Sequence, residues 1–203
     1  MILSDREYYE RLKLLLERVV LAHCKKLFRN YLQSNYLTLF TFLDRNKHRI
    51  MHCFRYDTYC CFKNKYKCVL NNTQTLTEYA WRKIYMDMTT VKCVKDGCIC
   101  HVLTKSRRMP KMNVDFLTFL IREFNIVEYK KFPAVYELEK FHAFFQNLEN
   151  TRVTRDEYQR VWNKVSESLM ILGLEIELIN DIKMSIPSPV PVKRVSQSIL
   201  HNI

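Results

Sequence analysis

Glycine is nearly absent from this sequence, which contains only Gly97 and Gly173 among its 203 residues. Sandwiches and barrels with many tight hairpins need glycine at positions of positive φ, so these folds do not suit the chain. Phosphate-cradling glycine loops and the nucleophile elbow of hydrolases also need glycine, and we find neither motif. With the glycine-dependent folds excluded, we expect a helical fold. A chain of this length that is 48% hydrophobic can bury one sizeable core.

Long apolar runs are also missing. No stretch reaches the roughly twenty apolar residues that span a bilayer, and no signal peptide is recognisable. We therefore expect a soluble, intracellular and cytoplasmic protein that neither enters a membrane nor shows a small-molecule site. In that setting the eight cysteines are expected to be reduced thiols, some of them bound to metal, and not a disulfide framework.

Acidic residues are outnumbered, because 33 Lys and Arg residues stand against 21 Asp and Glu residues, for a formal charge of +12. Such a balance suits nucleic acid, an acidic protein surface or an anionic membrane. It equally suits a protein that uses its charge only for solubility. Charge alone does not choose between these readings.

Helical patterns fill the first part of the chain. Ser4 and Glu7 form a capping box that predicts a long first helix ending near Gln33. Its apolar stripe consists of Tyr8, Leu12, Leu15, Val19, Ala22 and Tyr31. Residues 36–50 favour a second helix, and Thr77 is a plausible cap for a short helix within residues 76–86.

Three further helices are predicted in the second part. Asn113 caps a helix at residues 114–126, and Pro133 suits the first position of a helix that continues through residues 135–147. The last helix follows a capping box of Thr154 and Glu157 and extends to about residue 183, bending or ending at Gly173. We expect one helical domain at residues 1–184, interrupted by a Cys-rich insert and basic loop at 51–112. Residues 185–203 are expected to be a proline-rich, extended or disordered tail.

Three motifs connect these elements to a known family. Residues 80–85 read Ala-Trp-Arg-Lys-Ile-Tyr, Asp115 leads an apolar helix, and Thr154 opens a helix that continues through Tyr158 and Trp162 to Gly173. In this order the motifs resemble the HEPN superfamily, in the branch named after the DAZ-interacting zinc-finger ubiquitin ligase. The resemblance covers roughly residues 5–173 and implies an all-α, HEPN-like helical bundle.

The same resemblance implies a function and partners. In this branch such domains are joined to death-fold, NTPase or ubiquitin-ligase modules, which implies a role in innate immune or stress signalling. The chain would then act as a protein-interaction or RNA-binding module. Helix pairing in the superfamily implies a homodimer, or a heterodimer with another HEPN-containing partner, through the last two helices.

The ribonucleases of this superfamily carry an Arg-x4-6-His motif on the penultimate helix, where a histidine can act as general base. The matching helix here has no arginine followed by histidine at that spacing. His142 falls near the family's arginine and Asn147 near its histidine, and asparagine cannot act as a base. We therefore expect a catalytically silent domain and no enzyme. The alternatives are a diverged, metal-independent ribonuclease that uses His142, or a packed His142 that only makes hydrogen bonds.

The Cys-rich insert has a composition that suits zinc, which takes four thiolate or imidazole ligands. The candidate ligands are Cys60, Cys61, Cys68, Cys93, Cys98, Cys100 and His101. Relatives in the branch, including a group from bivalve molluscs, carry a similar cluster around the tryptophan. Paired C-x-x-C spacing is absent, so ordinary buried thiols and a mainly structural zinc module both remain open.

A basic loop follows the insert. Its cations, which are candidates for contacts with RNA phosphates, are Lys105, Arg107, Arg108 and Lys111. The alternative is a solvated surface with no ligand.

If the insert is a zinc module, purified protein will contain stoichiometric zinc and will lose thermal stability when a chelator removes it. Elemental analysis combined with melting curves, with and without chelator, measures both effects. Cooperative melting of a metal-free preparation at the same temperature with and without chelator would refute the zinc hypothesis.

Overall fold

The computed structural model describes residues 4–54, 76–87, 102–105, 112–148 and 151–185. This part of the chain is mainly helical, and its strands form a single two-stranded sheet. The all-α class expected from the sequence is therefore correct at this level. No helix in the described ranges is long and apolar enough to cross a bilayer.

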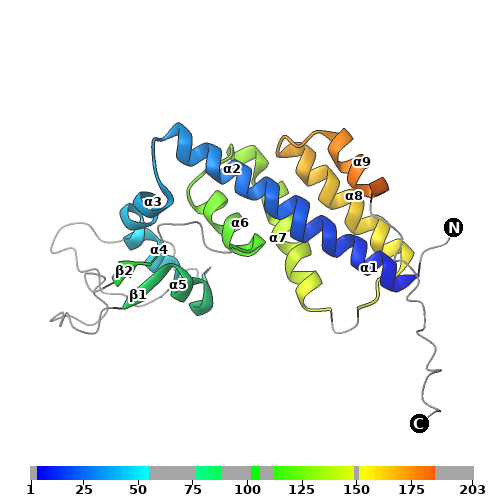
Figure 1. Ribbon diagram of the computed structural model, residues 1–203, viewed down its shortest axis with the longest axis horizontal. Helices are drawn as coiled ribbons and strands as arrows, with labels where there is room; N and C mark the ends of the chain where they lie inside the picture. The colour runs from blue at the N-terminus through cyan, green and yellow to red at the C-terminus, as the bar shows by residue number, and fades with distance from the viewer. Residues whose placement is uncertain (1–3, 55–75, 88–101, 106–111, 149–150, 186–203) are drawn as a thin grey trace, which may run out of the picture.

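One long N-terminal helix runs along the molecule (Figure 1). It consists of α1 (Asp5–Leu14), the π-helical segment η1 (Leu15–Val20) and α2 (Leu21–Ser34). The capping box of Ser4 and Glu7 is present, because the Glu7 amide donates to the Ser4 hydroxyl and the Glu7 carboxylate accepts from the Ser4 amide. The predicted first helix is confirmed, with its end one residue beyond Gln33.

The π-helical segment changes which side of this helix is buried. The sequence pattern predicted Ala22 on the buried stripe, but Ala22 is exposed, while His23 and Cys24 are buried. A π-helical turn contains more residues than an α-helical turn, so every position after η1 is displaced around the axis. A 3.6-residue period applied to the whole helix is therefore wrong for the residues beyond Val20.

Three helices pack around the long helix. They are α6 (Val114–Glu123), α7 (Phe132–Gln146) and α8 (Arg155–Ile171), with the 3-10 turn η2 (Tyr129–Lys131) before α7. α6 packs on α2, α8 packs on α1, and α7 lies between α6 and α8 (Figure 1). The cap of Asn113 on α6 and the capping box of Thr154 on α8 are both present, as predicted.

A smaller group of elements lies at the far end of α2 (Figure 1). It contains α3 (Leu39–Arg45), α4 (Lys47–Phe54), α5 (Glu78–Ile84), β1 (Tyr85–Asp87) and β2 (Val102–Thr104). The strands pair antiparallel, with Tyr85 opposite Thr104. The buried Tyr85 hydroxyl donates to the Leu43 carbonyl at 2.8 Å, and Trp81 stacks on Phe54 with ring centroids 5.1 Å apart.

Two expectations for this region need correction. The single helix expected at residues 36–50 is two helices, because the α3 helix ends at Arg45 and α4 begins at Lys47. The short helix capped by Thr77 is present, but it ends at Ile84 and the chain continues as a strand. The insert therefore contributes one ordered strand pair, which a search for helical periodicity does not detect.

Three helices end in the same motif, and only one of them uses glycine. After α2, α6 and α8 the chain adopts positive φ at Tyr36 (54°), Asn125 (50°) and Gly173 (94°). In each case the next residue's amide bonds back across the helix end, as Leu37 does to the Leu32 carbonyl at 2.8 Å. This is the Schellman arrangement, which favours glycine at the left-handed position. Gly173 therefore ends α8, and a separate helix, α9 (Ile176–Ser185), follows.

Replacing Tyr36 by glycine should stabilise the protein. The Tyr36 side chain is 98% exposed and contributes little packing, whereas a non-glycine residue with left-handed backbone costs about 1–2 kcal/mol. We expect Tyr36→Gly to raise the free energy of unfolding by about 1 kcal/mol in urea denaturation. Tyr36→Ala is the matched control, because it removes the ring but keeps a non-glycine residue in the left-handed conformation. Equal stability of the two variants would contradict this account of the turn.

Candidate functional site

The seven residues predicted to bind zinc lie outside the described residues: Cys60, Cys61, Cys68, Cys93, Cys98, Cys100 and His101. Zinc binding by the insert therefore remains a prediction. Within the described ranges, no three His, Cys, Asp or Glu side chains are grouped closely enough to hold a metal ion. The two described cysteines, Cys24 and Cys53, are both buried, and neither forms a disulfide bond. Burial raises the pKa of the Cys24 thiol to about 12, so it is a neutral core side chain at pH 7.

Of the predicted RNA-binding cations, only Lys105 lies in the described residues; Arg107, Arg108 and Lys111 do not. Its amide donates to the Ile84 carbonyl at 2.7 Å and its ammonium donates to the Arg82 carbonyl, also at 2.7 Å. These two hydrogen bonds connect Lys105, the residue after β2, to α5. RNA binding by this loop remains a prediction.

His142 lies on the side of α7 that packs against α6. Only 7% of the residue is exposed, and its Nδ1 lies 2.6 Å from Oδ1 of Asp115 on α6. Its other ring nitrogen, Nε2, lies 3.4 Å from the Gln146 amide nitrogen one turn later on α7. Both ring nitrogens are therefore engaged within the protein.

Local structure explains why Asp115 is available for this contact. It lies in the first turn of α6, where the helix dipole favours a negative charge. The side-chain amide of Asn113, which caps the helix, donates to Oδ2 of Asp115 at 3.1 Å. One carboxylate oxygen is thus bound by Asn113 and the other by His142.

The Asp115–His142 pair has the form of a histidine base with its orienting carboxylate. In the tautomer whose Nδ1–H donates a hydrogen bond to Asp115, Nε2 of His142 is the acceptor atom. That atom lies 3.4 Å from the side-chain amide nitrogen of Gln146. Asn147, the other position of the degenerate ribonuclease motif, is the exposed C-cap of α7. The contact between Asp115 and His142 joins α6 to α7.

A second polar contact joins the same two helices. The Arg122 guanidinium on α6 lies 2.8 Å from a Glu139 carboxylate oxygen on α7, and it also covers the Tyr136 ring at 4.1 Å. Burial raises the pKa of the Glu139 carboxyl, Arg122 opposes that rise, and the nearby Asp115 charge adds to it. The seam between α6 and α7 therefore contains two polar contacts, Asp115 with His142 and Arg122 with Glu139.

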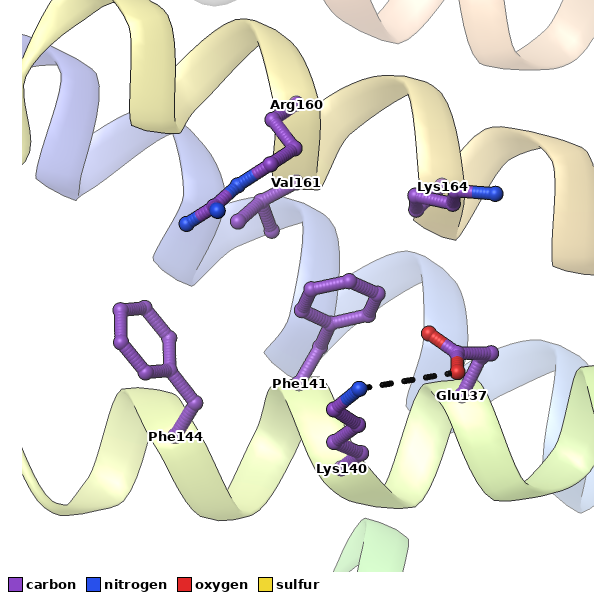
Figure 2. A pocket seen from close by; sticks show the side chains of 7 residues that line it. All are labelled: Glu137, Lys140, Phe141, Phe144, Arg160, Val161 and Lys164. Atoms are coloured by element: carbon purple, nitrogen blue, oxygen red, sulfur yellow. Dashed lines mark ion pairs between the residues drawn. The ribbon is translucent and has the colours of Figure 1, made fainter.

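The opposite side of α7 is open. A groove of about 440 Å³ lies between α7 and α8, within the size range of ligand sites. We call it the α7–α8 groove, and it is lined by Glu137, Lys140, Phe141, Phe144, Arg160, Val161 and Lys164. Figure 2 shows Phe141 and Phe144 rising from α7 toward α8, with Arg160 extending from α8 toward them.

Helical spacing explains why these residues meet. Glu137, Lys140, Phe141 and Phe144 recur at intervals of three or four residues and so share one side of α7. His142 and Leu138 belong to the other side and are buried. Phe141 is partly buried against the core, while Phe144 remains 36% exposed. The groove has an apolar wall and can hold an apolar side chain.

Cations surround the groove, and we call Lys140, Arg160 and Lys164 the basic rim. Two of them have loose partners, since Lys140 lies 3.9 Å from Glu137 and Lys164 lies 3.5 Å from Glu167. Both pairs are solvent-exposed, and such pairs contribute little. No sequence motif marks the groove, although the spacing of Phe141 and Phe144 is a usable signal for its α7 side.

A double-mutant cycle will measure the contact of Asp115 with His142. We expect Asp115→Ala and His142→Ala to be coupled by about 1 kcal/mol in the free energy of unfolding, because each removes the same charge-assisted hydrogen bond. The control cycle combines Asp115→Ala with Lys140→Ala, which lies on the other side of α7 and should be additive. A coupling energy no larger than that of the control would show that the contact contributes nothing.

Known proteins offer no independent assignment of the chain. Comparisons with protein-family models, with curated proteins and with solved structures found no match. The HEPN resemblance therefore remains a hypothesis that rests on the sequence around Trp81 and from Thr154 to Gly173.

Proposed function

We propose that this chain is a catalytically silent, HEPN-like helical domain that acts as a binding module, with the α7–α8 groove as its principal binding surface. The observation that carries the proposal is the contrast between the two sides of α7. One side buries its only histidine, and the other exposes an aromatic groove with a basic rim.

The state of His142 supports a silent domain. A general base must reach the proton of a substrate directly or through one water. His142 is buried, and its ring nitrogens contact Asp115 and Gln146. Substrate access to His142 would require α6 and α7 to separate.

The groove supports binding. Apolar surface that remains exposed beside charged groups is typical of sites that another molecule covers. Phe144 supplies exposed ring surface, and Arg160 supplies a guanidinium next to it. A role in innate immune or stress signalling, and a dimeric or HEPN-containing partner, belong to the proposal through the resemblance alone.

A cleavage assay tests the proposal that the domain has no ribonuclease activity. We expect end-labelled single-stranded RNA to stay intact with purified protein, with or without chelator, and His142→Ala to give the same result. Metal-independent cleavage that is lost in His142→Ala would refute the proposal in favour of a diverged ribonuclease. A salt-dependent mobility shift without cleavage would keep the module silent and make RNA its ligand.

A further inference from the structure

We infer that the α7–α8 groove binds a short acidic segment of another protein, in which one bulky apolar side chain lies within a helical turn of a carboxylate. This inference rests on the proposed function, because it names the partner of the same groove. It draws on the length of the groove, the state of Arg160 and the charges of the rim.

The length of the groove limits the ligand to a small anchor. On α7 the lining residues run from Glu137 to Phe144, and on α8 from Arg160 to Lys164. Four residues of helix rise about 6 Å, so the α8 side is one turn long. A groove of this length holds one or two side chains and not a whole helix face. The apolar atoms of Phe141, Phe144 and Val161 are suited to a leucine or an aromatic ring.

Arg160 supplies the polar half of the site. None of the ion pairs between described residues includes Arg160. Glu157, one turn earlier on α8, accepts from Thr154 in the capping box at 2.9 and 2.8 Å, and the Arg160 charge makes a smaller contribution to lowering its pKa. The Arg160 guanidinium extends over the groove beside Phe144 (Figure 2), so its planar donors can bind a carboxylate at two points.

The charges of the rim favour a carboxylate over a polyanion. Two of the three cations of the basic rim have a carboxylate nearby, Glu137 at 3.9 Å from Lys140 and Glu167 at 3.5 Å from Lys164, so the rim is not an unbroken row of positive charge. A single-stranded nucleic acid requires a row of phosphate contacts and aromatic rings with open faces. Phe141 is packed against the core, so Phe144 is the lining ring with substantial exposure. One carboxylate with one apolar anchor matches these charges and this exposure.

Like charge opposes self-association through this groove. A two-fold interface places the same patch of both copies together, so the two basic rims would approach each other. With a formal charge of +12 on each chain, that approach is opposed at long range as well. An acidic segment has no such penalty.

Selection from a random peptide library displayed on phage, followed by fluorescence anisotropy with a selected labelled peptide, tests the inference. We expect the enriched peptides to carry Asp or Glu three or four positions from Leu, Phe or Trp. Arg160→Glu and Phe144→Ala should each weaken binding at least tenfold, and Arg160→Lys should retain part of it. Arg155→Glu is the matched control on the same helix outside the groove, and it should change binding less than twofold. Circular dichroism of every variant checks that the fold is kept.

The contrary results separate this inference from the proposed function. No enrichment, basic enriched peptides, or binding that Arg160→Glu and Phe144→Ala leave unchanged would overturn the acidic-segment assignment. A labelled 20-nucleotide poly(U) RNA that binds through Arg160, or a dimer that Arg160→Glu dissociates in light scattering, would do the same while leaving a silent binding module in place. RNA cleavage dependent on His142 would overturn both.

Discussion

Burial of one side of the long N-terminal helix is the constraint on which the rest of the bundle depends. Leu12, Leu16, Val20 and Phe28 are almost completely buried, and they can be covered only if α8 lies against α1 and α6 lies against α2. α7 then fits between α6 and α8. Its two sides consequently meet different neighbours, which is why one side carries a closed polar seam and the other an open groove.

Caps made most of the helical fold predictable from the sequence. Ser4, Thr77, Asn113 and Thr154 bond to amides within three residues, so the signal is local and the helices begin where the pattern indicates. The missed features depend on distant residues. The strand pair joins residues 85–87 to residues 102–104, and the π-helical segment has no marker residue of its own.

The candidate site was less predictable for the same reason. A packed, hydrogen-bonded His142 was one of the readings open to the sequence, and the structure has it in that state. Its partner Asp115 is 27 residues away, and no local pattern pairs them. Predicting the groove from the sequence would likewise require knowing that Arg160 lies opposite Phe144. The zinc and RNA hypotheses concern other residues, nearly all of them outside the described ranges.

The contact between the starts of α1 and α8 also has a consequence for the order in which the chain folds. The Val153 amide donates to the Asp5 carbonyl at 3.0 Å, and the rings of Tyr8 and Tyr158 lie 4.8 Å apart. These partners are separated by about 150 residues, which takes about ten to thirty seconds to synthesise at typical rates. During translation the apolar stripe of α1 therefore has no native cover until α8 has been made. Helix α1 is thus synthesised well before α8 and is enclosed only after it, so its apolar side chains lack their native partners during that interval.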